Sequence, residues 1–315
     1  MAPAADGAKY TAAPGCRDPN AVNLYVAAFG FGLVSMSVIA IAAVGFTMQF
    51  GITNMINLAY GEVMISSAYV AYYMNRVGIS IWIGIIGGAL FGAVFSFLLN
   101  RIVYAPFMRK GTSHIGMVIV SLAISLMMAN LLLPLVGYYS VSYQNSTGDL
   151  VRIGSIVLTT DQIAIMVIAV VLMLGIHALL RYTRLGKAMR ATSANPTLAR
   201  NCGIPTQRVI DTVWVITGAL CGMAGVVAAM NSDSFAIANG AGFLITVLAA
   251  AVLGGAGQPY GAMIGAVLIG LITELSAATW SPQYKEVVAF GILVLVMVLR
   301  PQGLLAKRGA LAAAG

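Results

Sequence analysis

Long apolar runs alternate with short polar stretches along most of the 315-residue chain. Most runs have the length that an α-helix needs to cross a hydrocarbon layer of about 30 Å at 1.5 Å per residue. The pattern predicts nine segments, at 22–48, 58–75, 79–102, 113–136, 161–181, 209–230, 243–253, 260–278 and 285–299. The expected fold is an all-α polytopic transmembrane bundle of about 8–10 segments.

Two of these segments follow interruptions that resemble one another. The apolar run 243–278 is too long for one span and contains Gly254 to Pro259, a stretch rich in glycine that no unbroken helix would hold. This break precedes Tyr260-Gly261, as an earlier Gly/Asn interruption at 51–57 precedes Tyr60-Gly61. Matched breaks of this kind mark the substrate pathway in secondary transporters, so interrupted helices in two related halves are expected.

Composition supports a membrane protein. The chain is 60% hydrophobic and 8% charged, whereas a soluble domain carries about 25% charged residues. Thirty-five glycines suit membrane helices whose backbones pack closely. The net charge of +8 by itself would allow a nucleic-acid partner, but the positions of the charges favour a topological role, and no nucleic acid is expected.

The basic residues predict the orientation of the chain. Twelve of the 17 Lys and Arg residues fall in 101–111, 181–208 and 300–315, which nine crossings place on one side. The positive-inside rule makes that side cytoplasmic. The expected organisation is an extracytoplasmic tail 1–20, a transmembrane domain 21–300 with a cytoplasmic loop 182–208, and a cytoplasmic tail 301–315.

The central polar loop contains the signals of a very short helix. Asn195 can cap it, Pro196 suits its first turn, Gly203 suits a left-handed stop and Pro205 blocks continuation. Residues 196–202 would form a rod about 10 Å long. A loop that only joins two membrane helices needs no rod, so we expect this one to press on another protein.

Glu62 and Glu274 are the carboxylates that lie well inside apolar runs. Because a buried acid is costly in a membrane, each should face the bundle interior or water. For Glu62, which follows Asn54, Asn57 and Tyr60, a pathway role and a structural hydrogen-bonding role are both open. For Glu274, near its helix end, structural pairing or snorkelling is favoured. Three further polar residues are expected to bond between helices: Asn100, Asn130 and His177.

Enzyme and metal signatures are missing from the sequence. The two histidines lie far apart, and Gly186-Lys187 lacks the upstream glycine and following hydroxyl residue of a phosphate loop. The three cysteines have no metal-binding spacing. We expect no catalytic residue, metal or cofactor in this chain, so a partner or an ion gradient must drive any active transport.

Four motifs, in order, resemble the permeases of bacterial branched-chain amino acid ABC importers. The stretch 51–62 is similar to their G-x-x-N-x-A-H/Y-G-E/D motif, with Tyr60 where His is usual. The stretch 183–204 resembles their cytoplasmic coupling loop, and 253–262 and 300–304 resemble their C-terminal signatures. The resemblance extends from about residue 30 to residue 305.

This resemblance implies a multi-pass subunit of the bacterial inner membrane, surrounded by membrane lipid. It implies a second homologous permease, two cytoplasmic ATP-binding subunits that hold ATP and Mg, and an extracytoplasmic binding protein that delivers a small-molecule substrate. The implied translocation pathway comprises Asn54, Asn57, Tyr60, Glu62, Gly255, Gly257 and Tyr260. The implied ATPase-coupling residues are Arg190, Ala191, Asn195, Leu198, Ala199, Arg200, Cys202 and Gly203, with Leu198 and Cys202 on one contact face.

Several alternatives remain at the level of the sequence. Leucine, isoleucine and valine are the default substrates, but related permeases carry urea, short amides or aromatic acids. An ion-coupled secondary transporter, with Glu62 as a proton relay, would also suit interrupted helices, although it leaves the capped helix unexplained. A membrane enzyme or channel is disfavoured because no catalytic constellation is present.

Overall fold

The computed structural model describes residues 19–144, 150–153, 156–232, 234–279, 281–299 and 303. The proposed tails 1–20 and 301–315 therefore lie almost entirely outside the described residues.

All nine predicted membrane segments are confirmed as helices. They are α1 (Pro19–Thr53), α2 (Tyr60–Arg76), α3 (Ile81–Leu99) continued by the π-helical turn η1 (Asn100–Tyr104) and α4 (Ala105–Arg109), α5 (His114–Val136), α6 (Thr160–Tyr182), α9 (Thr206–Asn231), α10 (Asn239–Gly254), α11 (Pro259–Thr279) and α12 (Lys285–Leu299). Within the described part of the chain, seven spans are long and apolar enough to cross a membrane. The other two of the nine are α2, with 17 residues, and α10, with 16.

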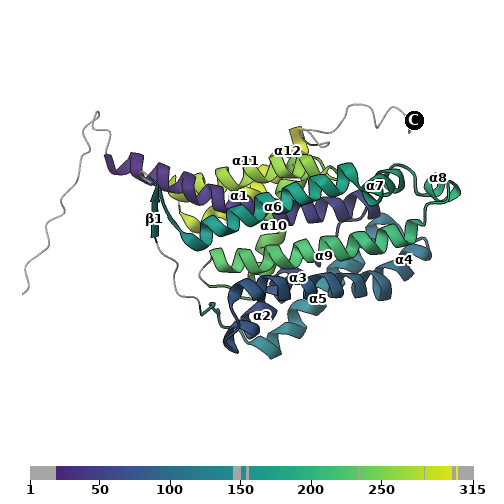
Figure 1. Cartoon of the computed structure of the whole chain (residues 1–315), viewed down its shortest axis with the longest axis horizontal. Coiled ribbons are helices and arrows are strands. Elements are labelled where there is room, and N and C mark those ends of the chain that lie inside the picture. Colours follow the sequence, from purple (N-terminus) through teal and green to yellow (C-terminus); the bar gives the residue numbers. More distant parts are fainter. Residues whose placement is uncertain are drawn as a thin grey trace, which may run out of the picture.

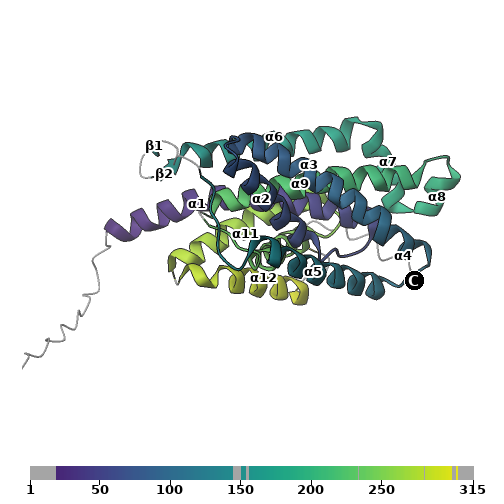
Figure 2. The ribbon, with the colours of Figure 1, turned by 90° about the horizontal axis from the view of Figure 1, so that it is seen from below.

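The helices lie side by side in one elongated bundle (Figures 1 and 2). One end of the bundle, here called the α8 end, carries α4 and the two loop helices α7 (Arg184–Ala194) and α8 (Pro196–Asn201). The opposite end, called the β1 end, carries a hairpin of β1 (Leu150–Ile153) and β2 (Ile156–Thr159). A 3₁₀ turn, η2 (Pro282–Tyr284), joins α11 to α12.

The helix α2 begins near the middle of the bundle. The Cys221 thiol of α9 donates to the carbonyl of Tyr60 at 3.3 Å, and Cys221 lies about 22 Å along α9 from its start at Thr206, at 1.5 Å per residue. From there α2 runs parallel to α9 toward the β1 end, because Gly225 of α9 lies against the backbone of Met64.

The helix α10 also begins near the middle, but it runs in the other direction. A Cβ on Gly61 would overlap the carbonyl of Gly240, so the first turns of α2 and α10 touch. At its far end α10 packs on the start of α11, near Gly257, which lies beside Gly51 of α1 at the α8 end. The short helices α2 and α10 therefore meet start to start at mid-bundle and point to opposite ends.

This arrangement corrects one expectation about the interruptions. The sequence paired the break at 51–57 with the one at 254–257. In the fold, the irregular stretch before α2 corresponds instead to the stretch between α9 and α10. Each of these two stretches leads to a short helix, α2 or α10, that begins near the middle of the bundle. The positive φ angles of Gly255 and Gly257, 107° and 87°, allow a tight reversal there, so this stretch is the turn from α10 to α11.

Glycines hold the central helices together. Gly88 and Gly92 of α3 face Gly218 and Gly222 of α9, and a Cβ at any of these four positions would overlap an atom of the facing helix. In hydrocarbon no hydrophobic effect draws helices together, so association depends on such close packing. The α3–α9 contact is therefore a structural support for the middle of the bundle.

A substitution at this contact should be strongly destabilising. We expect Gly222→Leu to lower the free energy of unfolding by about 3 kcal/mol or more, because the new side chain enters the backbone of α3. Gly175→Leu is the matched control, since a Cβ at Gly175 meets nothing within 4 Å. Thermal melting of the detergent-solubilised variants measures the difference, and equal melting temperatures would contradict this account.

Candidate functional site

The irregular stretch 54–59 enters the bundle from the α8 end. Asn54 ends α1 in the left-handed conformation, with φ at 50°, and its amide nitrogen Nδ2 lies 3.2 Å from Nε2 of His114 at the start of α5. Asparagine tolerates this conformation better than other residues with a side chain. The stretch thus leaves α1 and turns inward beside α5.

Polar side chains satisfy the backbone groups that the missing helix turn frees. The Asn57 carboxamide oxygen accepts from the backbone amide of Ala59 at 3.1 Å and from the Tyr104 hydroxyl at 2.9 Å. Ser121 of α5 accepts from the backbone amide of Leu58. Since unsatisfied backbone is very costly inside a membrane, these bonds explain how an irregular segment is stable there.

Tyr60 is fixed where α2 begins. Its ring is buried, its hydroxyl donates to the carbonyl of Ala42 in α1 at 3.0 Å, and it packs edge-on against Phe46. A Cβ on Gly45 would overlap the Tyr60 hydroxyl, so glycine makes room for the ring. Tyr60 therefore joins α1, α2 and α9 at one point.

Glu62 lies where the starts of α2 and α10 meet. It is 6% exposed, its Oε2 atom has no hydrogen-bond partner among the described residues, and a Cβ on Gly240 would lie 3.3 Å from that atom. Helix N-termini carry partial positive charge. The Glu62 carboxylate thus stands beside two such termini, which favours a negative group at mid-bundle and leaves one oxygen available to a passing donor.

The other three expected pathway residues lie elsewhere. Gly255 and Gly257 form the α10–α11 turn at the α8 end, where Gly303 also packs on Gly255. Tyr260 is 45% exposed, and its hydroxyl lies 3.1 Å from Nδ1 of His177 on α6. The structure therefore groups Asn54, Asn57, Tyr60 and Glu62 and separates the remaining three from them.

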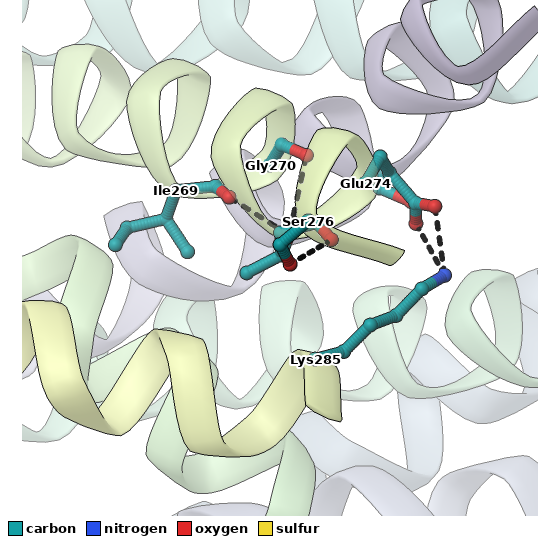
Figure 3. A network of polar contacts seen from close by, with 7 residues as sticks. Ile269, Gly270, Glu274, Ser276 and Lys285 are labelled. Carbon is teal, nitrogen blue, oxygen red and sulfur yellow. Dashed lines mark hydrogen bonds and ion pairs between the residues drawn. The ribbon is translucent and has the colours of Figure 1, made fainter. Parts of the chain in front are cut away.

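The expected structural roles of polar residues are largely confirmed. Glu274 accepts from Ser35 of α1 at 2.6 Å. It also forms an ion pair with Lys285 at 2.7 Å (Figure 3). Asn100 bonds Asp211 on α9, and His177 bonds Tyr260 on α11. The expectation for Asn130 is wrong, because its amide donates to the carbonyl of Leu126 in its own helix.

The capped short helix is confirmed as α8, one residue shorter than expected. Asn195 accepts from the backbone amide of Leu198 at 2.9 Å, and Pro196 opens the helix. At its end, Gly203 has φ of 82°, and the amides of Gly203 and Ile204 bond back to Arg200 and Ala199. This pair of bonds is a Schellman stop, which requires the left-handed conformation of glycine.

The coupling residues fall into two groups by exposure. Leu198 is 60% exposed, and Arg190, Asn195, Arg200, Cys202 and Gly203 are also exposed, whereas Ala191 is half-buried and Ala199 is buried. Leu198 is thus an apolar side chain that no described residue covers. Arg190 already has a partner within the chain, since its guanidinium donates to the carbonyl of Leu180 at the end of α6.

Sequence reasoning missed the helix α7 and the polar supports of Asn57. Thr183 caps α7, and the buried residues Gly186, Met189 and Thr192 recur every three positions along one face. That spacing was a usable signal for an amphipathic helix. No such signal identifies Tyr104 and Ser121, which are far from Asn57 in the sequence. Among the described residues, no cluster of three potential metal ligands occurs.

Comparison with known proteins agrees with this geometry. Residues 28–297 match the family described as branched-chain amino acid transport system, permease component. The chain is 31% identical to the high-affinity branched-chain amino acid transport system permease protein LivH of Escherichia coli K12, over 88% of this chain and 94% of LivH. It is 30% identical to BraD of Pseudomonas aeruginosa, with the same coverage.

Two further similarities are more distant. A 135-residue part is 33% identical to LivM of Escherichia coli K12, over 41% of this chain and 30% of LivM. The fold resembles a chain of PsaBC from Streptococcus pneumoniae in complex with Fab, with a TM-score of 0.50 at 16% identity, over 86% of this chain and 91% of that chain. The full-length matches establish that the chain belongs to the family of branched-chain amino acid transport permeases, which are multi-pass ABC transport subunits without an ATPase of their own.

Proposed function

We propose that this permease imports branched-chain amino acids, or a related small polar solute, when partner subunits hydrolyse ATP. The observation that carries the proposal is the exposed helix α8, which is capped at both ends and lies at one end of the bundle. The sequence of the chain contains no nucleotide-binding motif. The exposed Leu198, two residues before the basic Arg200, suits a contact with another protein.

The proposed assembly contains four kinds of subunit. A second permease would complete the core, and the partial similarity to LivM supports a related partner chain. Two ATP-binding subunits, which hold ATP and Mg, would bind the α8 end. A binding protein would deliver the solute at the β1 end and would supply much of the specificity.

We place the α8 end in the cytoplasm. Arg101, Arg109, Lys110 and the basic residues of 181–208 lie there, whereas Arg76 and Lys285 lie at the other end. The positive-inside rule favours this orientation. The N-terminus would then be outside and the C-terminus cytoplasmic, in the inner membrane of a bacterium.

The proposed translocation pathway passes Asn54, Asn57, Tyr60 and Glu62. These residues form a polar line from the α8 end to the middle of the bundle, where one Glu62 oxygen has no partner among the described residues. Gly255, Gly257 and Tyr260 would act at the rim of this route. The coupling residues of α7 and α8 would move with the ATPases. This motion would reach α1, because Ser193 of α7 donates a hydrogen bond to the carbonyl of Gly51 at the end of α1.

Cysteine labelling tests the orientation. Cys202 is exposed at the α8 end and Cys221 is buried, so a Cys16→Ser chain presents one accessible thiol. We expect a membrane-impermeant maleimide to label it in inside-out vesicles and not in right-side-out cells. Labelling from the outside only would reverse the orientation.

Substitution of Gly203 tests coupling. We expect Gly203→Val to preserve insertion but to separate ATP hydrolysis from uptake, because a β-branched residue is strained at φ of 82° and should undo the helix stop. Gly203→Asn is the control, since asparagine accepts this conformation. Uptake and ATPase rates in proteoliposomes measure the effect, and normal coupling in the valine variant would argue against the role of α8.

Substitution of Glu62 tests the pathway. We expect Glu62→Gln to reduce ATP-driven leucine uptake about tenfold or more, the effect of losing a charged hydrogen-bond partner. Melting temperature should change little, because the carboxamide keeps the volume of the side chain. Wild-type uptake in this variant would assign Glu62 a structural role only.

The second candidate function is a secondary transporter. The short helices α2 and α10 favour it because both begin near the middle of the bundle, as interrupted helices do in such transporters. Proteoliposomes that lack the ATPases distinguish the two. Uptake driven by a pH or sodium gradient alone would support the secondary transporter.

A further inference from the structure

A cavity of about 500 Å³ opens at the β1 end of the bundle, among α1, α10, α11 and α12. Such a volume is typical of small-molecule sites. The part nearest the middle of the bundle is lined by Ala42 and Met64. The carbonyl of Ala42 accepts a hydrogen bond from the Tyr60 hydroxyl, and Met64 lies two residues after Glu62 in α2. The cavity therefore extends from the β1 end to the Tyr60 and Glu62 end of the proposed pathway.

One wall of the cavity is apolar. It is formed by Val38, Ile39, Phe243 and Val247. These side chains are branched or aromatic and come from α1 and α10. An aliphatic group would replace water against this wall, which is favourable in proportion to the apolar area covered.

Another part of the cavity wall is charged. Glu274 and Lys285 form the ion pair that Figure 3 shows, and Lys285 remains partly exposed. Glu286 also lines the cavity, and its carboxylate occupies the space beside Gly242 that a Cβ would fill. Among the described residues, Glu286 forms no hydrogen bond or ion pair. This part of the wall thus presents a carboxylate that no described residue pairs, together with an ammonium group whose negative partner is shared with Ser35.

We propose that this cavity is a binding site for an aliphatic amino acid on its way through the permease. The Glu286 carboxylate accepts from the α-ammonium group, Lys285 contacts the α-carboxylate, and the aliphatic side chain lies on Val38, Ile39, Phe243 and Val247. A zwitterion suits this lining because its two charges can meet a carboxylate without a partner among the described residues and a partly exposed ammonium. The inference rests on the proposed function and specifies the substrate class at one site.

The test compares three ligands on the assembled transporter in nanodiscs of phosphatidylglycerol, a lipid without an amine. L-Leucine carries both charged groups, isoamylamine lacks the carboxylate and 4-methylpentanoate lacks the ammonium group. Saturation-transfer NMR on the methyl protons detects weak binding of each. We expect wild type to bind leucine best and 4-methylpentanoate least.

Two variants separate the roles of the charged residues. Glu286→Gln should weaken leucine and isoamylamine about tenfold or more, as expected for loss of a charged partner. Lys285→Met should weaken leucine binding by a similar factor. Isoamylamine should bind at least as well as to wild type, because Glu274 loses its ion-pair partner and can then attract the ligand's ammonium group. Asp161→Asn, at the start of α6 and away from the cavity, removes one charge as a control and should change neither ligand.

Clear outcomes would overturn the proposal. Unchanged leucine binding in Glu286→Gln, or equal loss in Asp161→Asn, would show that the cavity does not hold the ligand. Ethanolamine headgroup contacts that appear in nanodiscs with phosphatidylethanolamine and disappear in Glu286→Gln, without leucine binding, would identify a lipid site instead.

ATP-driven uptake in the same preparations separates this inference from the proposed function. Wild-type uptake of leucine without any effect of the cavity variants on binding would reject the site and leave the proposed function intact. Absence of ATP-driven uptake of any amino acid would reject the proposed function, whatever the cavity binds.

Discussion

Close contact between helix backbones at glycine is the interaction on which the rest of this structure depends. Within hydrocarbon, lipid tails solvate apolar side chains as well as another helix does, so helices associate through dense packing. The pairs Gly88–Gly222 and Gly92–Gly218 bring α3 and α9 together at distances that no side chain would permit. Gly61 does the same for the starts of α2 and α10.

The last of these contacts creates the polar centre of the protein. The helices α2 and α10 begin at the same depth, so the unpaired backbone amides and partial positive charges of their first turns meet there. The Glu62 side chain lies beside the start of α10, and Asn57, Tyr104 and Ser121 complete the hydrogen bonds of the adjoining segment. The irregular backbone directly before α2 is therefore enclosed by protein. That place is also where a transported solute would find polar groups.

The ends of the bundle differ in chemistry. At the α8 end, α7 connects the exposed helix α8 to the body through Arg190 at the end of α6 and Ser193 at the end of α1. A force applied to α8 would therefore act on α1, directly before the stretch that leads to Glu62. At the β1 end, charged and apolar side chains line the same cavity. The proposed importer would thus have its ATPase contact at one end and its solute site at the other.

The sequence by itself determined the nine helices, the caps of α8, the glycine stop at Gly203 and the family. These depend on apolar length, side-chain caps and short ordered motifs, which are local properties of the chain. It also grouped Asn54, Asn57, Tyr60 and Glu62 correctly, since they are close in sequence. Only the tertiary structure decided which interruption pairs with which, that Glu62 faces the start of α10, and that Glu286 lines a cavity. Those features depend on contacts between segments far apart in the sequence, for which neither hydropathy nor spacing carries a signal.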